Sequence, residues 1–162
     1  MSVGGTTLSL DSSGRLISET AWSGSGGGVS DYEPRPSYQY YWQDAWWGRA
    51  TPDVSYDADP NTGVSVYVSN YYGYTGWYTV GGTSAGAPQW AALFAIVNAG
   101  RSYPLSSSDV ALYSLGKANY HWYYRDVIYG CDGGYCSTSG YDYVTGLGSP
   151  LAHHLIPSLR SY

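Results

Sequence analysis

Short stretches of alternating apolar and polar residues, separated by glycine-rich or polar turns, make up the first half of the chain. Residues 3–10 and 15–22 alternate in this way on either side of a polar turn, which predicts two strands. The glycine-rich stretch 23–30 predicts a loop inside one domain, because both of its flanks are rich in Trp and Tyr rather than in residues typical of disorder. Three more strands are predicted at residues 53–56, 64–69 and 77–80.

The pattern changes to a helical period after residue 83. Apolar residues recur at i, i+3, i+4 and i+7 from Trp90 to Val97, and alanines and Ile96 fill most positions between them. This pattern predicts a helix that is buried nearly all round and ends at Gly100, with Pro88 in its first turn. Two further helices are predicted at residues 106–115 and 151–159, and residues 38–47 are predicted to form a short helix or a loop packed on the core.

Length and charge restrict the class of protein. A chain of 162 residues with 43% apolar side chains corresponds to about one domain. Charged residues make up 12% and the net charge is −5, so neither a broad phosphate-binding face nor a nucleic-acid partner is expected. The longest apolar run, residues 90–97, is far shorter than the ~20 residues that span a bilayer, so no membrane span is expected. Met1 leads directly into a predicted strand, without the basic start and apolar stretch of a secretory signal.

Aromatic residues are unusually frequent, with 20 Tyr and 7 Trp in the chain. Both side chains place a large apolar area at a surface while keeping a polar group, which suits a rigid extracellular protein or a carbohydrate-binding face. One functional hypothesis is therefore a non-catalytic secreted domain that binds peptide or glycan through its Tyr and Trp side chains.

Ser84 is the candidate nucleophile. It follows a predicted strand and the two glycines Gly81 and Gly82, and it stands where the predicted helix begins. The free N–H groups and the positive dipole end of a helix can stabilise negative charge on a substrate oxygen, and glycines allow a substrate backbone to approach closely. The alternative is that Ser84 only caps the helix, which serine does very often.

Residues 82–86 also match G-x-S-x-G, the nucleophile turn of α/β-hydrolases. In that hypothesis Asp126 or Asp142 would be the acid and His153 or His154 the base, because both follow the nucleophile in the chain.

A wider pattern of motifs resembles the sedolisins, the serine-carboxyl peptidases with a subtilisin-like fold. The blocks that carry the resemblance are residues 2–8 (SVGGTTL), Trp22 with 25–30 (SGGGVS), 36–39 (PSYQ), 49–60 (RATPDVSYDADP) with 62–63 (TG), 80–93 (VGGTSAGAPQWAAL), 125–127 (RDV) and 140–150 (GYDYVTGLGSP). The resemblance implies an α/β fold with a subtilisin-like, mostly parallel sheet and flanking helices, together with a calcium-binding loop region. It also implies that residues 1–162 are the C-terminal part of a peptidase domain, so that the fold is incomplete.

The resemblance identifies Ser84 as the nucleophile of an acid-acting endopeptidase or tripeptidyl peptidase. In the family a Glu acts as general base, an Asp four residues later orients it, and an Asp in an S-G-D block lines the oxyanion hole. The two glutamates here, Glu19 and Glu33, are followed four residues later by Ser23 and Ser37, and the chain has no S-G-D block. We therefore expect the isolated chain to be inactive, with the missing N-terminal part of the domain as its partner, a polypeptide as substrate and an extracellular location.

The resemblance also implies a calcium site in the last third of the chain. Its ligands would be the side chains of Asp126 and Asp142 and the backbone carbonyls of Val127, Thr138 and Gly140. Without the resemblance, Asp126 and Asp142 would be interpreted as two solvated loop carboxylates.

Cys131 and Cys136 lie in the same region, without the additional Cys or well-spaced His of a zinc site. A local disulfide that braces the loop is the prediction, which would fit an extracellular location. Two free thiols in a reducing compartment are the alternative.

Overall fold

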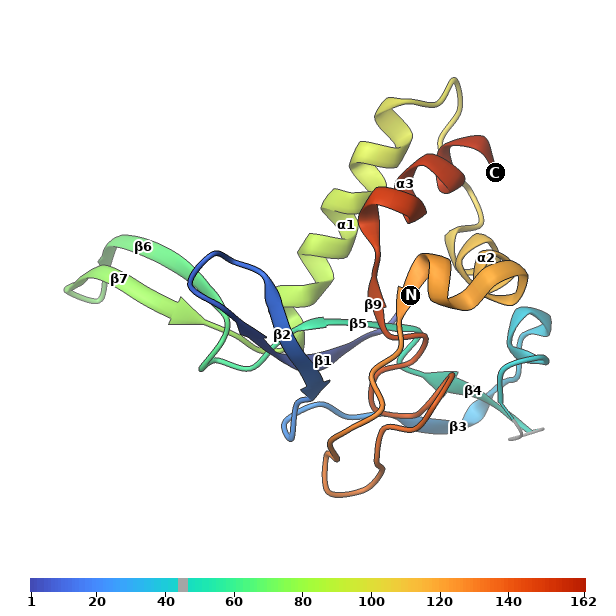
Figure 1. Ribbon diagram of the computed structural model, residues 1–162, viewed down its shortest axis with the longest axis horizontal. Helices are drawn as coiled ribbons and strands as arrows, with labels where there is room; N and C mark the ends of the chain where they lie inside the picture. Colours follow the sequence, from blue (N-terminus) through green and yellow to red (C-terminus); the bar gives the residue numbers. More distant parts are fainter. Residues whose placement is uncertain (44–46) are drawn as a thin grey trace.

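The computed structural model describes residues 1–43 and 47–162 (Figure 1). Its strands are β1 (Val3–Leu10), β2 (Leu16–Ala21), β3 (Gly28–Pro34), β4 (Gly48–Thr51), β5 (Val54–Asp57), β6 (Val64–Tyr71), β7 (Tyr74–Val80), β8 (Tyr124–Arg125) and β9 (Ser149–Pro150). Its helices are the 3-10 helix η1 (Ser37–Gln39) and the α-helices α1 (Thr83–Ala99), α2 (Ser108–Tyr123) and α3 (Ala152–Ser161). Of the segment 38–47, the first two residues belong to η1 and residues 44–46 lie outside the described part.

A three-stranded sheet in the order β2-β1-β5 forms the centre of the structure. β1 pairs with β2 in antiparallel fashion and with β5 in parallel, with Val3 opposite Val54. Two glycines allow other segments to approach β1 closely. A Cβ atom on Gly4 would collide with the carbonyl oxygen of Val144, and one on Gly5 would lie 2.8 Å from the Ala58 side chain.

The sheet differs from the mostly parallel one that the sequence predicted. Among the described residues, β1 with β5 is the one parallel pair, and the pairs β1–β2, β3–β4, β6–β7 and β8–β9 are antiparallel. Short connections between neighbouring strands favour antiparallel pairing, because a parallel pair needs a long crossover. The sequence did not predict strands β3 and β4. β3 begins at Gly28, inside the stretch 23–30 that was predicted to be a glycine-rich loop.

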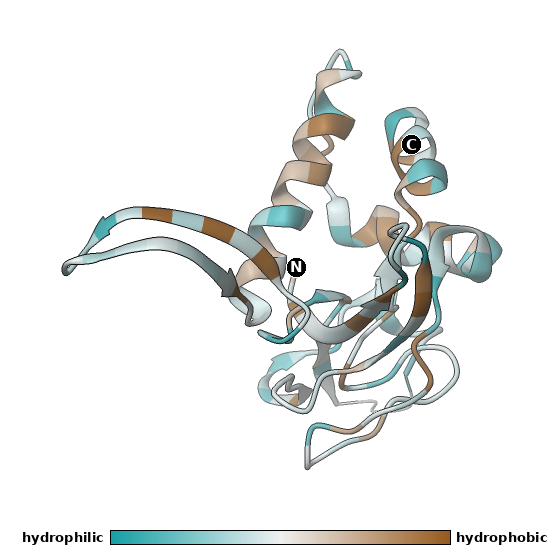
Figure 2. Ribbon diagram, turned by 60° about the vertical axis from the view of Figure 1, so that its left-hand side comes forward, coloured by the Kyte–Doolittle hydropathy of each residue, from teal (hydrophilic) through white to brown (hydrophobic). Residues whose placement is uncertain are grey.

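Strands β6 and β7 form a hairpin that extends away from the helices (Figures 1 and 2). Its turn contains Tyr72 and Gly73, both with positive φ angles, of 48° and 86°. Tyr67 and Trp77 lie opposite each other on the two strands, with ring centroids 5.3 Å apart. The strands predicted at 64–69 and 77–80 are confirmed as β6 and β7. Both faces of the hairpin are largely exposed, so these strands do not belong to the core.

The core lies where α1, α2 and α3 meet the central sheet. Trp90 of α1 is fully buried, and its indole Nε1 donates a hydrogen bond of 3.1 Å to the Ser55 carbonyl in β5. The other large buried side chains of this cluster are Val54, Leu93, Val97, Leu112, Tyr113, Tyr124, Leu147, Leu155 and Leu159.

The prediction that α1 is buried nearly all round is wrong. Its buried residues are Gly86, Trp90, Leu93 and Val97, which form one side of the helix. The opposite side is exposed although no charged residue occurs between residues 83 and 99. The physical reason is that α1 packs mainly against β1, β5 and α3, and these elements cover only the side that carries its buried residues.

The other helices agree with their predictions in type. α3 lies where it was predicted, whereas α2 continues to Tyr123, well beyond the predicted end near residue 115. It bends at Asn119, whose φ and ψ of −160° and 83° are not helical. No helix among the described residues is both long and apolar enough to cross a membrane.

Candidate active site

Ser84 lies at the start of α1 with its side chain exposed. Gly82 is the N-cap residue, and its φ of 103° belongs to the region that favours glycine. Ser84 is therefore the second residue of the helix, which excludes the interpretation that it is the N-cap. Within the described part of the chain, its hydroxyl makes no hydrogen bond. An exposed, uncommitted hydroxyl at the positive end of a helix dipole is the arrangement expected of a nucleophile.

The two histidines of the α/β-hydrolase hypothesis contact other groups. The His154 ring stacks on Trp122 at a centroid distance of 3.6 Å, and the His153 and His154 rings lie 3.9 Å apart. In the described residues neither imidazole is hydrogen-bonded to Ser84, and the strand before Ser84 belongs to the exposed hairpin rather than to the central sheet. The structure therefore does not form the α/β-hydrolase arrangement of nucleophile and base.

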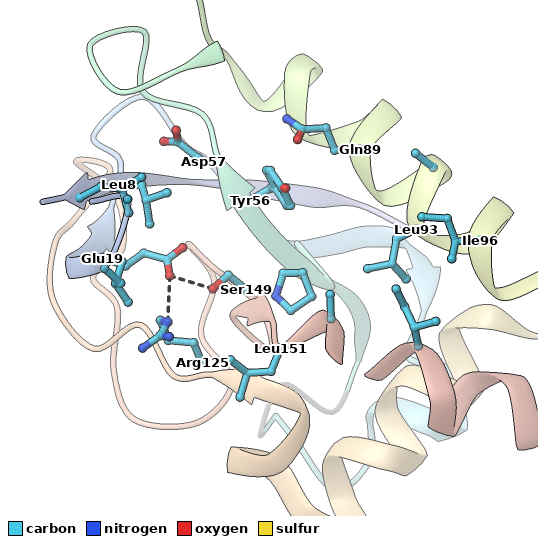
Figure 3. A pocket seen from close by; sticks show the side chains of 17 residues that line it. Leu8, Glu19, Tyr56, Asp57, Gln89, Leu93, Ile96, Arg125, Ser149 and Leu151 are labelled. Atoms are coloured by element: carbon cyan, nitrogen blue, oxygen red, sulfur yellow. Dashed lines mark hydrogen bonds and ion pairs between the residues drawn. The ribbon is translucent and has the colours of Figure 1, made fainter. Parts of the chain in front are cut away.

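Neither glutamate is placed as a base for Ser84. Glu33 is exposed on β3, whereas the Glu19 side chain on β2 is only 5% exposed. Thr6 Oγ1 and Ser149 Oγ each donate a hydrogen bond of 2.8 Å to the Glu19 carboxylate. Arg125 forms an ion pair with it at 3.5 Å, and Figure 3 shows the contacts of Glu19 with Ser149 and Arg125. Burial raises the pKa of Glu19, and this effect is larger than the lowering of its pKa by Ser149, Thr6 and Arg125.

The Asp126 carboxylate holds the loop that contains Gly140. It accepts hydrogen bonds from the Gly140 backbone N–H at 3.1 Å and from the Ser139 hydroxyl at 3.0 Å. The Tyr120 hydroxyl lies 3.1 Å from Asp126 Oδ1 and 3.2 Å from the Gly140 carbonyl oxygen, so these two oxygens face a common point.

Asp142 is hydrogen-bonded within its own turn. Its carboxylate accepts bonds from the backbone N–H groups of Val144 and Thr145 at 2.8 Å, and from that of Thr138 at 3.3 Å. Burial nevertheless raises the pKa of Asp142. The structure thus brings Asp126 together with Gly140, and Asp142 together with Thr138. Val127, the fifth predicted ligand, is buried next to Asp126 in the chain.

The predicted disulfide is confirmed, because Cys131 and Cys136 are bonded to each other. In the described residues no group of three or more His, Cys, Asp or Glu side chains is close enough to hold a metal ion. A site with two carboxylates would need backbone carbonyls for its remaining ligands.

Comparisons with known proteins identify the family, although no family model matches the chain. Kumamolisin from Bacillus sp. (strain MN-32) is 35% identical over 98% of this chain, and sedolisin from Pseudomonas sp. (strain 101) is 33% identical over 99%. Tripeptidyl-peptidase 1 from Bos taurus is 32% identical over 98%. The solved structure of Pseudomonas sedolisin, described as a serine-carboxyl proteinase complexed with two molecules of pseudo-iodotyrostatin, matches 98% of this chain with a TM-score of 0.87 and 34% identity. This chain belongs to the sedolisin family.

The chain has less than half the length of these relatives. It covers 30% of kumamolisin, 29% of sedolisin and 31% of the bovine peptidase, and it covers 45% of the solved sedolisin chain. Its fold is therefore the subtilisin-like α/β fold of the sedolisins in part, with a mixed sheet and three α-helices among the described residues.

The sequence did not predict the contacts that link Glu19 with Arg125 and Ser149 in this sedolisin fold. These residues come from β2, β8 and β9, which are distant in the sequence. The one available signal was that Arg125 and Ser149 both fall within blocks that resemble the family.

Replacing Glu19 with glutamine is expected to make stability less dependent on pH. Because the pKa of Glu19 is raised above its ordinary value of 4.5, the folded state holds the proton at a pH where the unfolded chain has lost it. The free energy of unfolding contributed by this group therefore falls as the pH rises from 4.5 through the raised pKa. Thermal melts across this range should show a flatter profile for Glu19→Gln than for the wild type. Glu33→Gln, on an exposed strand, serves as the control, and identical slopes for all three proteins would contradict the prediction.

Proposed function

We propose that this chain is the C-terminal part of an acid-acting serine-carboxyl peptidase domain and that Ser84 is its nucleophile. The observation that carries the proposal is the exposed, unbonded Ser84 hydroxyl at the start of α1, in a chain that superimposes on a serine-carboxyl proteinase. Ser84 Oγ would attack the carbonyl carbon of the scissile peptide bond while its proton passes to a general base. The leaving amine would then take that proton, and water would release the acyl group from Ser84.

The general base would come from the part of the domain that this chain does not contain. The Glu19 carboxylate accepts hydrogen bonds from Thr6 and Ser149 and forms an ion pair with Arg125. Glu33 lies exposed on β3. A serine hydroxyl without a base remains a weak nucleophile, so we expect the 162-residue chain alone to be inactive. A carboxylate base supplied by the remaining part of the domain would allow activity at acid pH, because a carboxylate keeps its basic form where an imidazole is protonated.

The test is peptide hydrolysis at acid pH by two proteins. One is the 162-residue chain, and the other is a chimera in which this chain replaces the matching part of Pseudomonas sedolisin. Activity in the chimera that is lost in Ser84→Ala supports the proposal. Activity of the 162-residue chain alone would contradict it.

We also propose that Ca²⁺ binds beside Asp126 and Asp142, with the carbonyls of Val127, Thr138 and Gly140 as further ligands. All five groups offer oxygen, the ligand atom that Ca²⁺ prefers. In the described residues neither carboxylate has a cationic side chain as a partner, and Asp142 is 6% exposed. When bound, the ion would supply the positive charge that offsets the burial of these carboxylates and would hold the loop in place.

Removing calcium is expected to lower the melting temperature. With free Ca²⁺ at 100 times its Kd, the ion would stabilise the folded state by about 2.7 kcal/mol. Thermal melts in Ca²⁺ and in chelator should therefore differ for the wild type and coincide for Asp126→Ala. Asp132→Ala is the matched control, because Asp132 is a carboxylate of the same region that bonds only to Gly134 and Tyr135 among the described residues. A wild type that melts equally with and without chelator would contradict the site.

An extracellular location is part of the same proposal and is supported by the Cys131–Cys136 disulfide, since disulfides persist mainly in oxidising compartments.

The second candidate function is a non-catalytic binding domain, which is favoured by the exposed aromatic residues of the β6–β7 hairpin. Tyr72 is 87% exposed and Trp77 71%. Peptide or glycan binding by a chimera that never hydrolyses peptide would support this alternative.

A further inference from the structure

The β6–β7 hairpin leaves the outer edges of both of its strands unpaired. The two strands form a sheet of their own, and in the described part of the chain no other segment forms a backbone–backbone hydrogen bond with residues 64–80. The hairpin extends away from the helices (Figure 1). An open edge presents a row of N–H and C=O groups with which another extended backbone can pair. The hairpin therefore keeps free the groups that bind an added strand.

One face of the hairpin, defined here as the valine face, is apolar. Val64 lies opposite Val80 and Val66 lies opposite Tyr78, so these four side chains share a face. The valines of β6 alternate with less apolar residues, as Figure 2 shows. An antiparallel sheet usually packs its apolar face on a core, whereas each of these side chains remains about 40% exposed.

The other face, defined here as the aromatic face, carries Tyr67 opposite Trp77. Three more tyrosines, Tyr71, Tyr72 and Tyr74, lie at the turn end of the hairpin. All five aromatic side chains are more than half exposed. Large apolar side chains that are exposed together mark a site of interaction.

The hairpin lacks the features that usually protect an open edge. Natural proteins block such edges with charged side chains, with proline or with a bulge that twists the edge away. No charged residue and no proline occurs between residues 64 and 80, and the register of the two strands shifts only near the turn, between Val68 and Tyr71. An uncharged segment can therefore pair with this edge without burying an unpaired charge.

The edge of β7 leads toward Ser84. β7 ends at Val80, and three residues separate this end from Ser84. Trp77 lies seven residues before Ser84, a distance of at most about 25 Å along an extended chain. A substrate segment of about eight residues beyond the reacting bond covers this distance. The open edge of β7 is therefore within reach of a polypeptide that reacts at Ser84.

We infer that the outer edge of β7 is an exosite that receives an extended, uncharged segment of the polypeptide substrate as a third strand. The inference rests on the proposed role of Ser84 and adds a determinant of substrate choice. A polypeptide is the occupant because its N–H and C=O groups match those of an open edge, whereas a glycan has no such backbone. The side chains of the added strand would point to the valine face and the aromatic face in turn, and both faces favour apolar residues.

The test compares the hydrolysis of short and long peptides by the sedolisin chimera. Two long peptides contain the short sequence with about eight uncharged residues, rich in Val and Thr, added at one end or the other. One of them should have a KM about tenfold below that of the short peptide, because several cross-strand pairs add to its binding. Trp77→Ala should remove this advantage. Tyr32→Ala, which removes an exposed tyrosine of β3, is the matched control and should keep it.

Two changes in the long peptide test the strand pairing itself. N-methylation of alternate backbone amides removes N–H donors, and it should abolish the advantage in one of the two possible alternations. Two lysines in the added segment should also abolish it, because residues 64–80 provide no acidic partner. An advantage that survives both N-methylations would overturn the inference.

The outcomes separate this inference from the proposed function. A chimera that hydrolyses short and long peptides with equal KM overturns the inference and leaves the function standing. If the chimera is inactive, binding of a labelled long peptide to the 162-residue chain that is lost in Trp77→Ala supports the polypeptide site and contradicts the function.

Two other occupants of the edge have their own signatures. Displacement of the labelled long peptide by a neutral oligosaccharide would identify a glycan as the occupant. Self-association of the 162-residue chain that Trp77→Ala abolishes would identify a second copy. Either result would overturn the inference.

Discussion

Replacing Ser84 with alanine is expected to abolish peptide hydrolysis by the complete domain, with a decrease in kcat of up to about 10⁶-fold. The loss is that large because, in the proposed mechanism, the Ser84 hydroxyl forms the covalent bond to the substrate. The measurement is kcat at acid pH for the chimera with and without the substitution.

A structural control accompanies this prediction. Because the Ser84 hydroxyl makes no hydrogen bond among the described residues, Ser84→Ala should melt at the same temperature as the wild type. Ser12→Ala, in the exposed turn between β1 and β2, should retain both activity and stability. Hydrolysis that survives Ser84→Ala would exclude Ser84 as the nucleophile.

Replacing Asp53 with alanine is expected to cost about 3–5 kcal/mol of stability. Asp53 is fully buried, and its partners come from the start of the chain, β4 and α2. Its Oδ2 accepts hydrogen bonds of 2.6 Å from Arg49 and from the Ser2 backbone N–H, and its Oδ1 accepts one of 2.9 Å from the Tyr113 hydroxyl. Alanine would leave a half-buried guanidinium and two other donors without their acceptor, which is the costly way to break a buried network.

Thermal or urea unfolding measures this effect. A loss of this size should lower the melting temperature by about 6–20 °C, since 1 kcal/mol corresponds to roughly 2–4 °C in a domain of this size. Asp31→Ala on exposed β3 is the matched control and should stay within about 0.5 kcal/mol of the wild type. Equal melting of the Asp53 and Asp31 variants would show that the network around Asp53 does not hold the fold together.

Local patterns in the sequence predicted the elements that carry the site. The glycines before Ser84 and the helical spacing from Trp90 to Val97 placed Ser84 at a helix start, and the structure has it there. Such predictions succeed because strand alternation, helix periodicity and turn chemistry depend on neighbouring residues.

The errors arose where contacts between distant segments decide the outcome. β3 was missed because its partner β4 lies across η1, and the pairing rather than the local sequence makes it a strand. The three donors around Asp53 come from Ser2, Arg49 and Tyr113, which no local pattern connects. Strand pairing and buried polar networks are decided by the tertiary fold.

Helix α1 shows most clearly what the sequence determines and what the tertiary structure decides. The sequence by itself determined that this helix is apolar on every side and that it begins beside Ser84. Only the tertiary structure decided which side is buried, because β1, β5 and α3 contact one face and leave the alanines open to solvent. Hydrophobic periodicity records what a helix needs to bury, whereas the packing partners present in the chain determine how much of that surface leaves water.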